Sequence, residues 1–171
     1  MVERRIKLTG IDEGLNVRIH TTLAGADSPT KIQEALQSLF PDFCVVSLPP
    51  EPVFGTGMDI TLANEGLSMS TFLNQLHEQR ILDTALDAMS RNLTETSTSF
   101  AISRLAALGG KIAFPIPGEI PVGGVIFVEL EGGGLEDWLQ AATWHEGRST
   151  VPRSVKDERA MDDDGEASTW I

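Results

Sequence analysis

Apolar and polar side chains alternate along several segments of the chain. In residues 16–24, Val17, Ile19, Thr21 and Leu23 alternate with polar neighbours, which predicts a half-buried strand. The same reasoning predicts strands in five further segments, of which the first is a short apolar run and the others alternate: residues 43–48, 58–63, 97–103, 111–116 and 125–131.

Apolar side chains that recur about every 3.6 residues predict helices between these strands. Ser28 is a candidate N-cap and Pro29 a candidate first residue for a helix that ends before Pro41. A long helix is expected over residues 71–93, with an apolar seam that Gln79 interrupts. Short helices are expected after Ser103 and within residues 132–144. This order of elements favours an α+β fold, with an antiparallel or mixed sheet and helices packed on one face.

Charge changes the picture, because the formal net charge of the 171 residues is −12. Most of the excess acid lies in residues 16–146, so the body of the protein is acidic. Such a surface repels phosphate backbones, unless the acidity reflects a salty cell. The only cysteine, Cys44, lies in a predicted strand and is expected to be buried and inert, which excludes a disulfide framework and favours a reducing cytoplasm.

Three regions are expected along the chain. Residues 1–15 form an N-terminal extension, residues 16–146 a single domain, and residues 147–171 a disordered acidic tail that is polar and aperiodic. No apolar run is long enough for a transmembrane helix, and the N-terminus lacks the apolar core of a secretory signal, so no membrane contact is expected.

Catalytic and metal-binding patterns are weak in this sequence. The three histidines, His20, His77 and His145, lie far apart and lack metal-ligand spacing. The segment at 109–111 lacks the residues of a phosphate-binding loop, and no nucleophile–base arrangement emerges from local signals. We therefore expect no catalytic residue, no metal site, no cofactor and no enzymatic activity.

One ordered set of segments resembles a known family. The chain reads QRILDTA at 79–85, GKIAF at 110–114, PVGGVIFVEL at 121–130 and LEDWL at 135–139. In this order and spacing it is similar to UPF0201, an uncharacterised archaeal family, over residues 16–144. The resemblance implies a fold similar to that of the ribosomal protein that holds 5S RNA in the large subunit. It also implies an RNA-binding module without catalysis.

The structured RNA that this resemblance implies would be contacted by three cations, namely Arg80, Arg104 and Lys111. One departure weakens the match, because Ser103, Arg104 and Leu105 stand where the family carries Asn-Lys-Gln. Tyrosine is absent, and Phe100 and Phe114 look like core residues, so a base-stacking platform is not expected.

The alternative is a protein-interaction or oligomerisation module without nucleic-acid binding, for example a homodimer, which the net charge favours. Under either function, the polar cluster around residues 79–84 is expected to be the solvated side of the long helix. Arg80 and Asp83 are three residues apart, and we expect them to pair and to orient the turn at Arg104.

Overall fold

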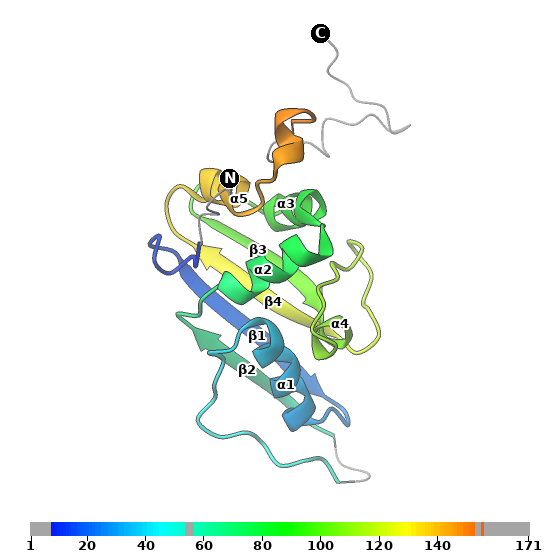
Figure 1. The fold of residues 1–171 in the computed structure, drawn as a ribbon. Coiled ribbons are helices and arrows are strands. Elements are labelled where there is room, and N and C mark those ends of the chain that lie inside the picture. Colours follow the sequence, from blue (N-terminus) through cyan, green and yellow to red (C-terminus); the bar gives the residue numbers. More distant parts are fainter. Residues whose placement is uncertain (1–7, 54–56, 153–154, 156–171) are drawn as a thin grey trace.

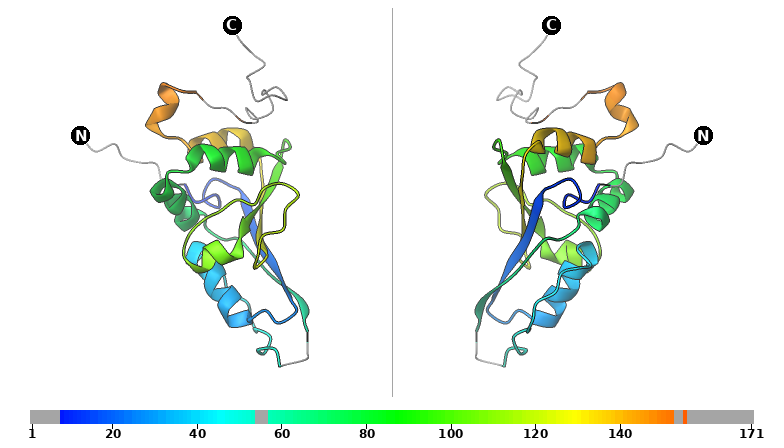
Figure 2. Two further views of the ribbon diagram at one scale, coloured as in Figure 1. Left: turned by 90° about the vertical axis from the view of Figure 1, so that its right-hand side faces the viewer. Right: turned by 90° about the vertical axis from the view of Figure 1, so that its left-hand side faces the viewer.

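A four-stranded antiparallel sheet organises the chain, and all helices near it lie on one face (Figures 1 and 2). The computed structural model describes residues 8–53, 57–152 and 155. Its strand order is β2-β1-β4-β3. The strands and helices are β1 (Asn16–Ala24), α1 (Pro29–Leu39), β2 (Asp59–Glu65), α2 (Ser70–Gln79), α3 (Leu82–Ser90), β3 (Ser97–Ser103), α4 (Arg104–Leu108), β4 (Val125–Glu131) and α5 (Leu135–Ala142). The predicted fold class is therefore confirmed.

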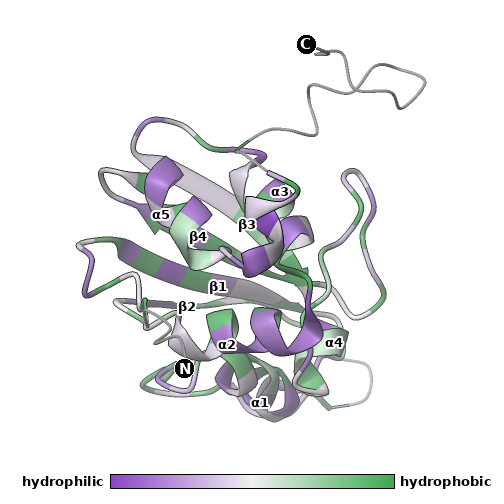
Figure 3. Cartoon of the chain, turned by 45° about the horizontal axis from the view of Figure 1, so that its top comes forward, coloured by the Kyte–Doolittle hydropathy of each residue, from purple (hydrophilic) through white to green (hydrophobic). Residues whose placement is uncertain are grey.

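The period of two in β1 decides which face of the sheet is buried. The ribbon of β1 alternates between hydrophobic and hydrophilic residues in Figure 3. Val17, Ile19 and Leu23 are fully buried beneath the helices, whereas Arg18 and His20 point to the other face. Burial of the apolar row stabilises the docked helices, and the polar row keeps the opposite face hydrated.

Aromatic rings join three elements in the core. Phe40 follows α1 and stacks on Phe72 of α2, with ring centroids 5.7 Å apart, and Phe72 lies 5.9 Å from Phe100 of β3. Leu86 of α3 is also fully buried in this cluster. The core thus fixes the helices against the strands through contacts between residues far apart in sequence.

The predicted long helix over 71–93 is wrong, because it breaks at Arg80. Arg80 takes the left-handed conformation (φ 57°, ψ 43°), and its backbone N–H donates to the carbonyl of His77. Next to the break, the Gln79 side chain donates to the carbonyl of Ile112 (2.9 Å) and accepts from its N–H (2.7 Å). A left-handed non-glycine residue costs about 1–2 kcal/mol, which the separate packing of α2 and α3 offsets.

Two predicted strands, 43–48 and 111–116, are also absent from the sheet. Gln79 occupies both backbone groups of Ile112, so that residue cannot join a ladder, although its side chain is buried. In the first segment the carbonyl of Phe43 accepts from the Gln37 side chain. Cys44 is exposed, so the expectation of a buried thiol is wrong.

Residues on both sides of the expected domain pack onto it. Among residues 8–15, Leu15 is buried and the Glu13 carboxylate accepts from Trp138 Nε1 (2.9 Å). Beyond α5, a 3-10 helix covers Glu146–Ser149. Within it Arg148, which was expected in the tail, is 8% exposed and donates to Asp83 Oδ1 of α3 (3.1 Å). Most of the rest of the expected tail lies outside the described residues.

Leu86→Ala is expected to lower the free energy of unfolding by about 2–5 kcal/mol, because it removes a fully buried side chain and leaves a cavity. Denaturant titration measures the loss. The exposed Thr84 on the same helix provides the control, since Thr84→Ala should change stability by less than about 0.5 kcal/mol. Equal effects of the two substitutions would contradict the packing of α3.

Asp83 should make the free energy of unfolding depend on pH in the acid range. Burial alone would raise the pKa of Asp83, but hydrogen bonds from His145 and Arg148 outweigh burial and hold the pKa below its usual value. A lowered pKa means that the carboxylate stabilises the fold at neutral pH, and that this contribution is lost as the pH falls through the lowered pKa, below about 4. The unfolding free energies of wild type and Asp83→Asn should therefore differ at pH 7 and converge at low pH. The control Glu78→Gln, at an exposed site on α2, should show no such pH-dependent difference from the wild type.

Candidate functional site

The face of the sheet that the helices leave uncovered is the candidate site, and we call it the open face. Its side chains are the outward-pointing residues of all four strands: Asn16, Arg18, His20, Thr22, Ala24, Asp59, Thr61, Ala63, Glu65, Ser97, Ser99, Ala101, Ser103, Val125, Phe127, Glu129 and Glu131. It carries four carboxylates and a single guanidinium, a net charge of −3 with histidine neutral. The open face is therefore acidic, like the chain as a whole.

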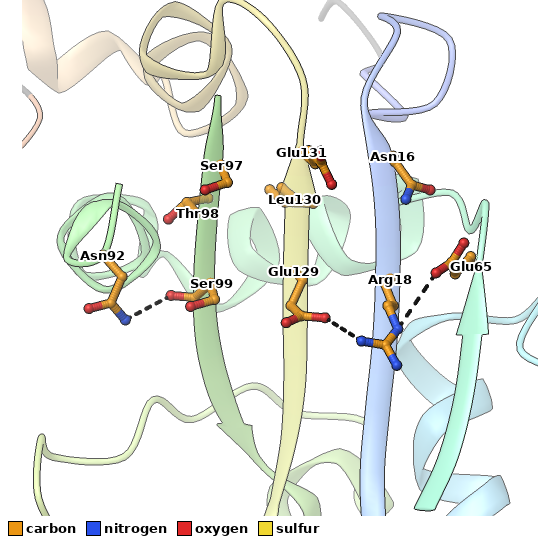
Figure 4. A pocket seen from close by; sticks show the side chains of 10 residues that line it. All are labelled: Asn16, Arg18, Glu65, Asn92, Ser97, Thr98, Ser99, Glu129, Leu130 and Glu131. Atoms are coloured by element: carbon orange, nitrogen blue, oxygen red, sulfur yellow. Dashed lines mark hydrogen bonds and ion pairs between the residues drawn. The ribbon is translucent and has the colours of Figure 1, made fainter. Parts of the chain in front are cut away.

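One end of the open face is a polar hollow of about 440 Å³ (Figure 4). Arg18 lies between Glu65 and Glu129 because β1 pairs with β2 on one side and with β4 on the other. The guanidinium reaches Glu129 Oε2 at 3.0 Å and Glu65 Oε1 at 3.6 Å. Glu131 extends beside them from β4 (Figure 4). The two ion pairs compensate the charge of Arg18 fully, so the end keeps a negative excess.

Beside the open face, at the β3 edge of the sheet, an apolar groove of about 360 Å³ lies between α3, β3 and the connection from α4 to β4. Phe127 of β4 lies on one side of the groove and stacks on His20, with ring centroids 5.1 Å apart. The connection between α4 and β4 forms the opposite lip and exposes Ile116 (64% exposed) and Ile120 (92% exposed) to solvent. Several large apolar side chains that are exposed close together are typical of interaction sites.

Arg104 holds the apolar lip in place. The residue is 8% exposed, and its Nε donates to the carbonyl of Gly123 at 2.6 Å, at the base of the lip. Its Nη1 donates to the carbonyl of Thr22 in β1 (2.8 Å), and its Nη2 pairs with Asp27 Oδ2 (3.0 Å). The guanidinium thus ties the lip to β1 and to the turn that precedes α1.

Gly124 is required beside this guanidinium. Its φ is +81°, a conformation that L side chains rarely adopt, and an added Cβ would lie 2.6 Å from Arg104 Nη2. The tight approach of the backbone to the guanidinium therefore explains the glycine at position 124.

The three RNA-contact candidates have different surroundings. Arg104 is occupied by the buried contacts described above, so it would have to break them to reach a phosphate. Arg80 and Lys111 are exposed. They are the sequence neighbours of Gln79 and Ile112, and the two hydrogen bonds between the Gln79 side chain and the Ile112 backbone bring the two cations close in space. The expected pair of Arg80 with Asp83 is not found, because Asp83 instead contacts His145 and Arg148.

Other site types receive no support within the described residues. Among them, no three His, Cys, Asp or Glu side chains gather in a way that could hold a metal ion. No helix within 8–53 or 57–152 combines the length and apolarity needed to cross a bilayer.

Comparisons with known proteins bear on the family. No family model matches the chain. A UPF0201 protein of Sulfurisphaera tokodaii is 30% identical over 128 residues, which cover 73% of this chain and 86% of the relative. The chain belongs to the UPF0201 family. A UPF0201 protein of Methanothermobacter thermautotrophicus is 29% identical over 144 residues, or 82% of this chain and 98% of the relative.

Solved structures support the fold of this UPF0201 chain. The crystal structure of a UPF0201 protein from Methanococcus jannaschii superposes with a TM-score of 0.61 at 23% identity, covering 77% of this chain and 96% of that one. A second UPF0201 crystal structure gives a TM-score of 0.58 at 20% identity over 73% and 90% of the two chains. The names of these relatives state the family and no activity.

Part of this site was predictable from the sequence. The alternation in 16–24 placed Arg18 and His20 on the row opposite the apolar side chains. The pairing of β1 with β4, which brings this row beside Phe127 and Glu129, had no local signal. The apolar lip was missed because the apolar residues of 112–116 were read as a strand.

Arg104→Ala is expected to cost about 3–5 kcal/mol of unfolding free energy, because it leaves Asp27 and two backbone carbonyls without their buried donor. Lys111→Ala removes an exposed cation from a neighbouring segment and should change stability by less than about 0.5 kcal/mol. Thermal and denaturant unfolding of both variants measure the difference. A loss below about 1 kcal/mol for Arg104→Ala would show that the lip does not depend on this side chain.

Proposed function

We propose that this UPF0201 protein is a non-catalytic protein-interaction module that binds a partner protein on its open face. The observation that carries the proposal is the apolar groove beside the open face, where Phe127 and the lip at Ile116 and Ile120 are exposed together and the end of α3 forms a further wall. Exposed apolar clusters rimmed by polar residues favour a protein partner.

The charge of the open face supports a protein over a nucleic acid. Its net charge of −3 repels phosphates, and its main cation, Arg18, is engaged by Glu65 and Glu129. Single-stranded RNA needs exposed aromatic faces for stacking, and the exposed ring on this face, Phe127, already stacks on His20. The open face therefore lacks what an RNA-binding sheet uses.

RNA binding remains a second candidate for one reason, the proximity of Arg80 and Lys111. Two phosphate contacts would give a salt dependence with a slope of only about −2, whereas non-specific binders commonly make roughly 6–10 contacts. Such a pair would supply only a weak affinity with a shallow salt dependence. This candidate also draws on the family resemblance in the sequence.

A photocrosslinking experiment separates the two functions. The photoreactive residue benzoylphenylalanine replaces Phe127 or, as a matched control, the exposed Thr84 on the helical side. Irradiation in cells that express the full chain should give a discrete protein adduct at 127 and none at 84. The adduct should disappear when Ile120→Asp is added, because a charge on the lip blocks the groove.

RNA adducts provide the opposite outcome. If irradiation instead gives RNA adducts that vanish in the double variant Arg80→Glu, Lys111→Glu and persist with Ile120→Asp, the interaction function is wrong and RNA binding takes its place. Unchanged melting temperatures of all variants show that they remain folded.

A further inference from the structure

The polar hollow and the apolar groove are both lined by residues of β4, and this fixes the distance between them. Phe127, Glu129 and Glu131 are successive outward residues of β4. With a rise of about 3.3 Å per residue, the two carboxylates lie about 7 and 13 Å along the strand from the apolar groove. Asn92 lines both hollows, so they are adjacent on the surface.

This layout pairs one apolar anchor site with acid at a set distance. A partner side chain that enters the groove contacts Phe114, Ile116 and Phe127 and loses its hydration there. A cation of the same partner then meets the carboxylates of Glu129 and Glu131. Glu129 shares its charge with Arg18, whereas no ion pair of Glu131 is found among the described residues.

A second copy of this chain fits the open face poorly. Two copies meeting face to face would each bring a net charge of −3, and like charges placed opposite one another disfavour the contact. The apolar grooves alone would have to overcome this repulsion. A partner with the opposite charge gains from the same carboxylates.

We infer that the open face binds a basic, extended segment of another protein, in which an apolar anchor residue is followed or preceded by Lys or Arg at two and four positions. In an extended segment these positions point to the same side and match the spacing of 7 to 13 Å. This inference rests on the proposed function and names the chemistry of its partner.

Peptide display against the immobilised full chain tests the inference. The probe is a library of random twelve-residue peptides, selected at about 50 mM salt. Enriched peptides should combine an aromatic or large aliphatic residue with Lys or Arg two and four positions away. Their affinity should fall at least tenfold for the variant Phe127→Ser and at least threefold for Glu131→Gln.

Matched variants keep the readout specific. Glu136→Gln removes an exposed carboxylate from α5, on the helical side, and should leave peptide affinity unchanged. Raising the salt to about 1 M should weaken the basic peptides, because the Debye length falls to about 3 Å. Phe127 and Glu131 point to solvent, so both variants should melt like the wild type.

Other results overturn the inference. Selection of acidic or purely apolar peptides, or of none, contradicts it, and so does a dimer in sedimentation equilibrium that Phe127→Ser dissociates. These results leave the proposed function standing if the crosslink at 127 persists. If no protein adduct forms at 127, or if the adduct persists unchanged with Ile120→Asp, the proposed function itself is wrong.

Discussion

The buried guanidinium of Arg104 is the interaction on which the candidate site depends. It bridges three segments that are distant in sequence, because it bonds Gly123, the β1 residue Thr22 and Asp27 before α1. A buried charge is costly unless each donor finds a partner, and here carbonyls, a hydroxyl and a carboxylate supply the partners. The bridge therefore fixes the lip of the groove against the sheet.

The lip is held at its other end by neutral hydrogen bonds. The side-chain amide of Gln79 donates to the carbonyl of Ile112 and accepts from its N–H, just where α2 ends. The connection between α4 and β4 is thus anchored at both ends, while its middle exposes Ile116 and Ile120. A connection with fixed ends and exposed apolar residues is a suitable surface for docking, because little ordering is needed on binding.

Charge and packing together separate the functions that the fold would allow. Open antiparallel sheets serve many purposes, so the fold alone does not name one. On this sheet, the acidic end disfavours phosphates and the apolar end favours a protein side chain. Arg104, which looked like a cation available to RNA, is instead a structural residue, and this shifts the balance of the two functions towards protein interaction.

Local patterns by themselves determined β1, β3, β4, α1 and α5, because the spacing of the apolar side chains in each segment fits only a strand or only a helix. They also determined the acidity of the chain and the polar row of β1. Tertiary structure alone decided the break at Arg80, since Gln79 could be recognised as an interruption but its partner, Ile112, lies 33 residues away. It decided that 111–116 is a lip and not a strand, because a side chain took the backbone bonds of Ile112. Likewise the groove exists only because the β3–β4 and β1–β4 pairings place Phe127 beneath that lip, and pairing partners leave no trace in a local sequence period.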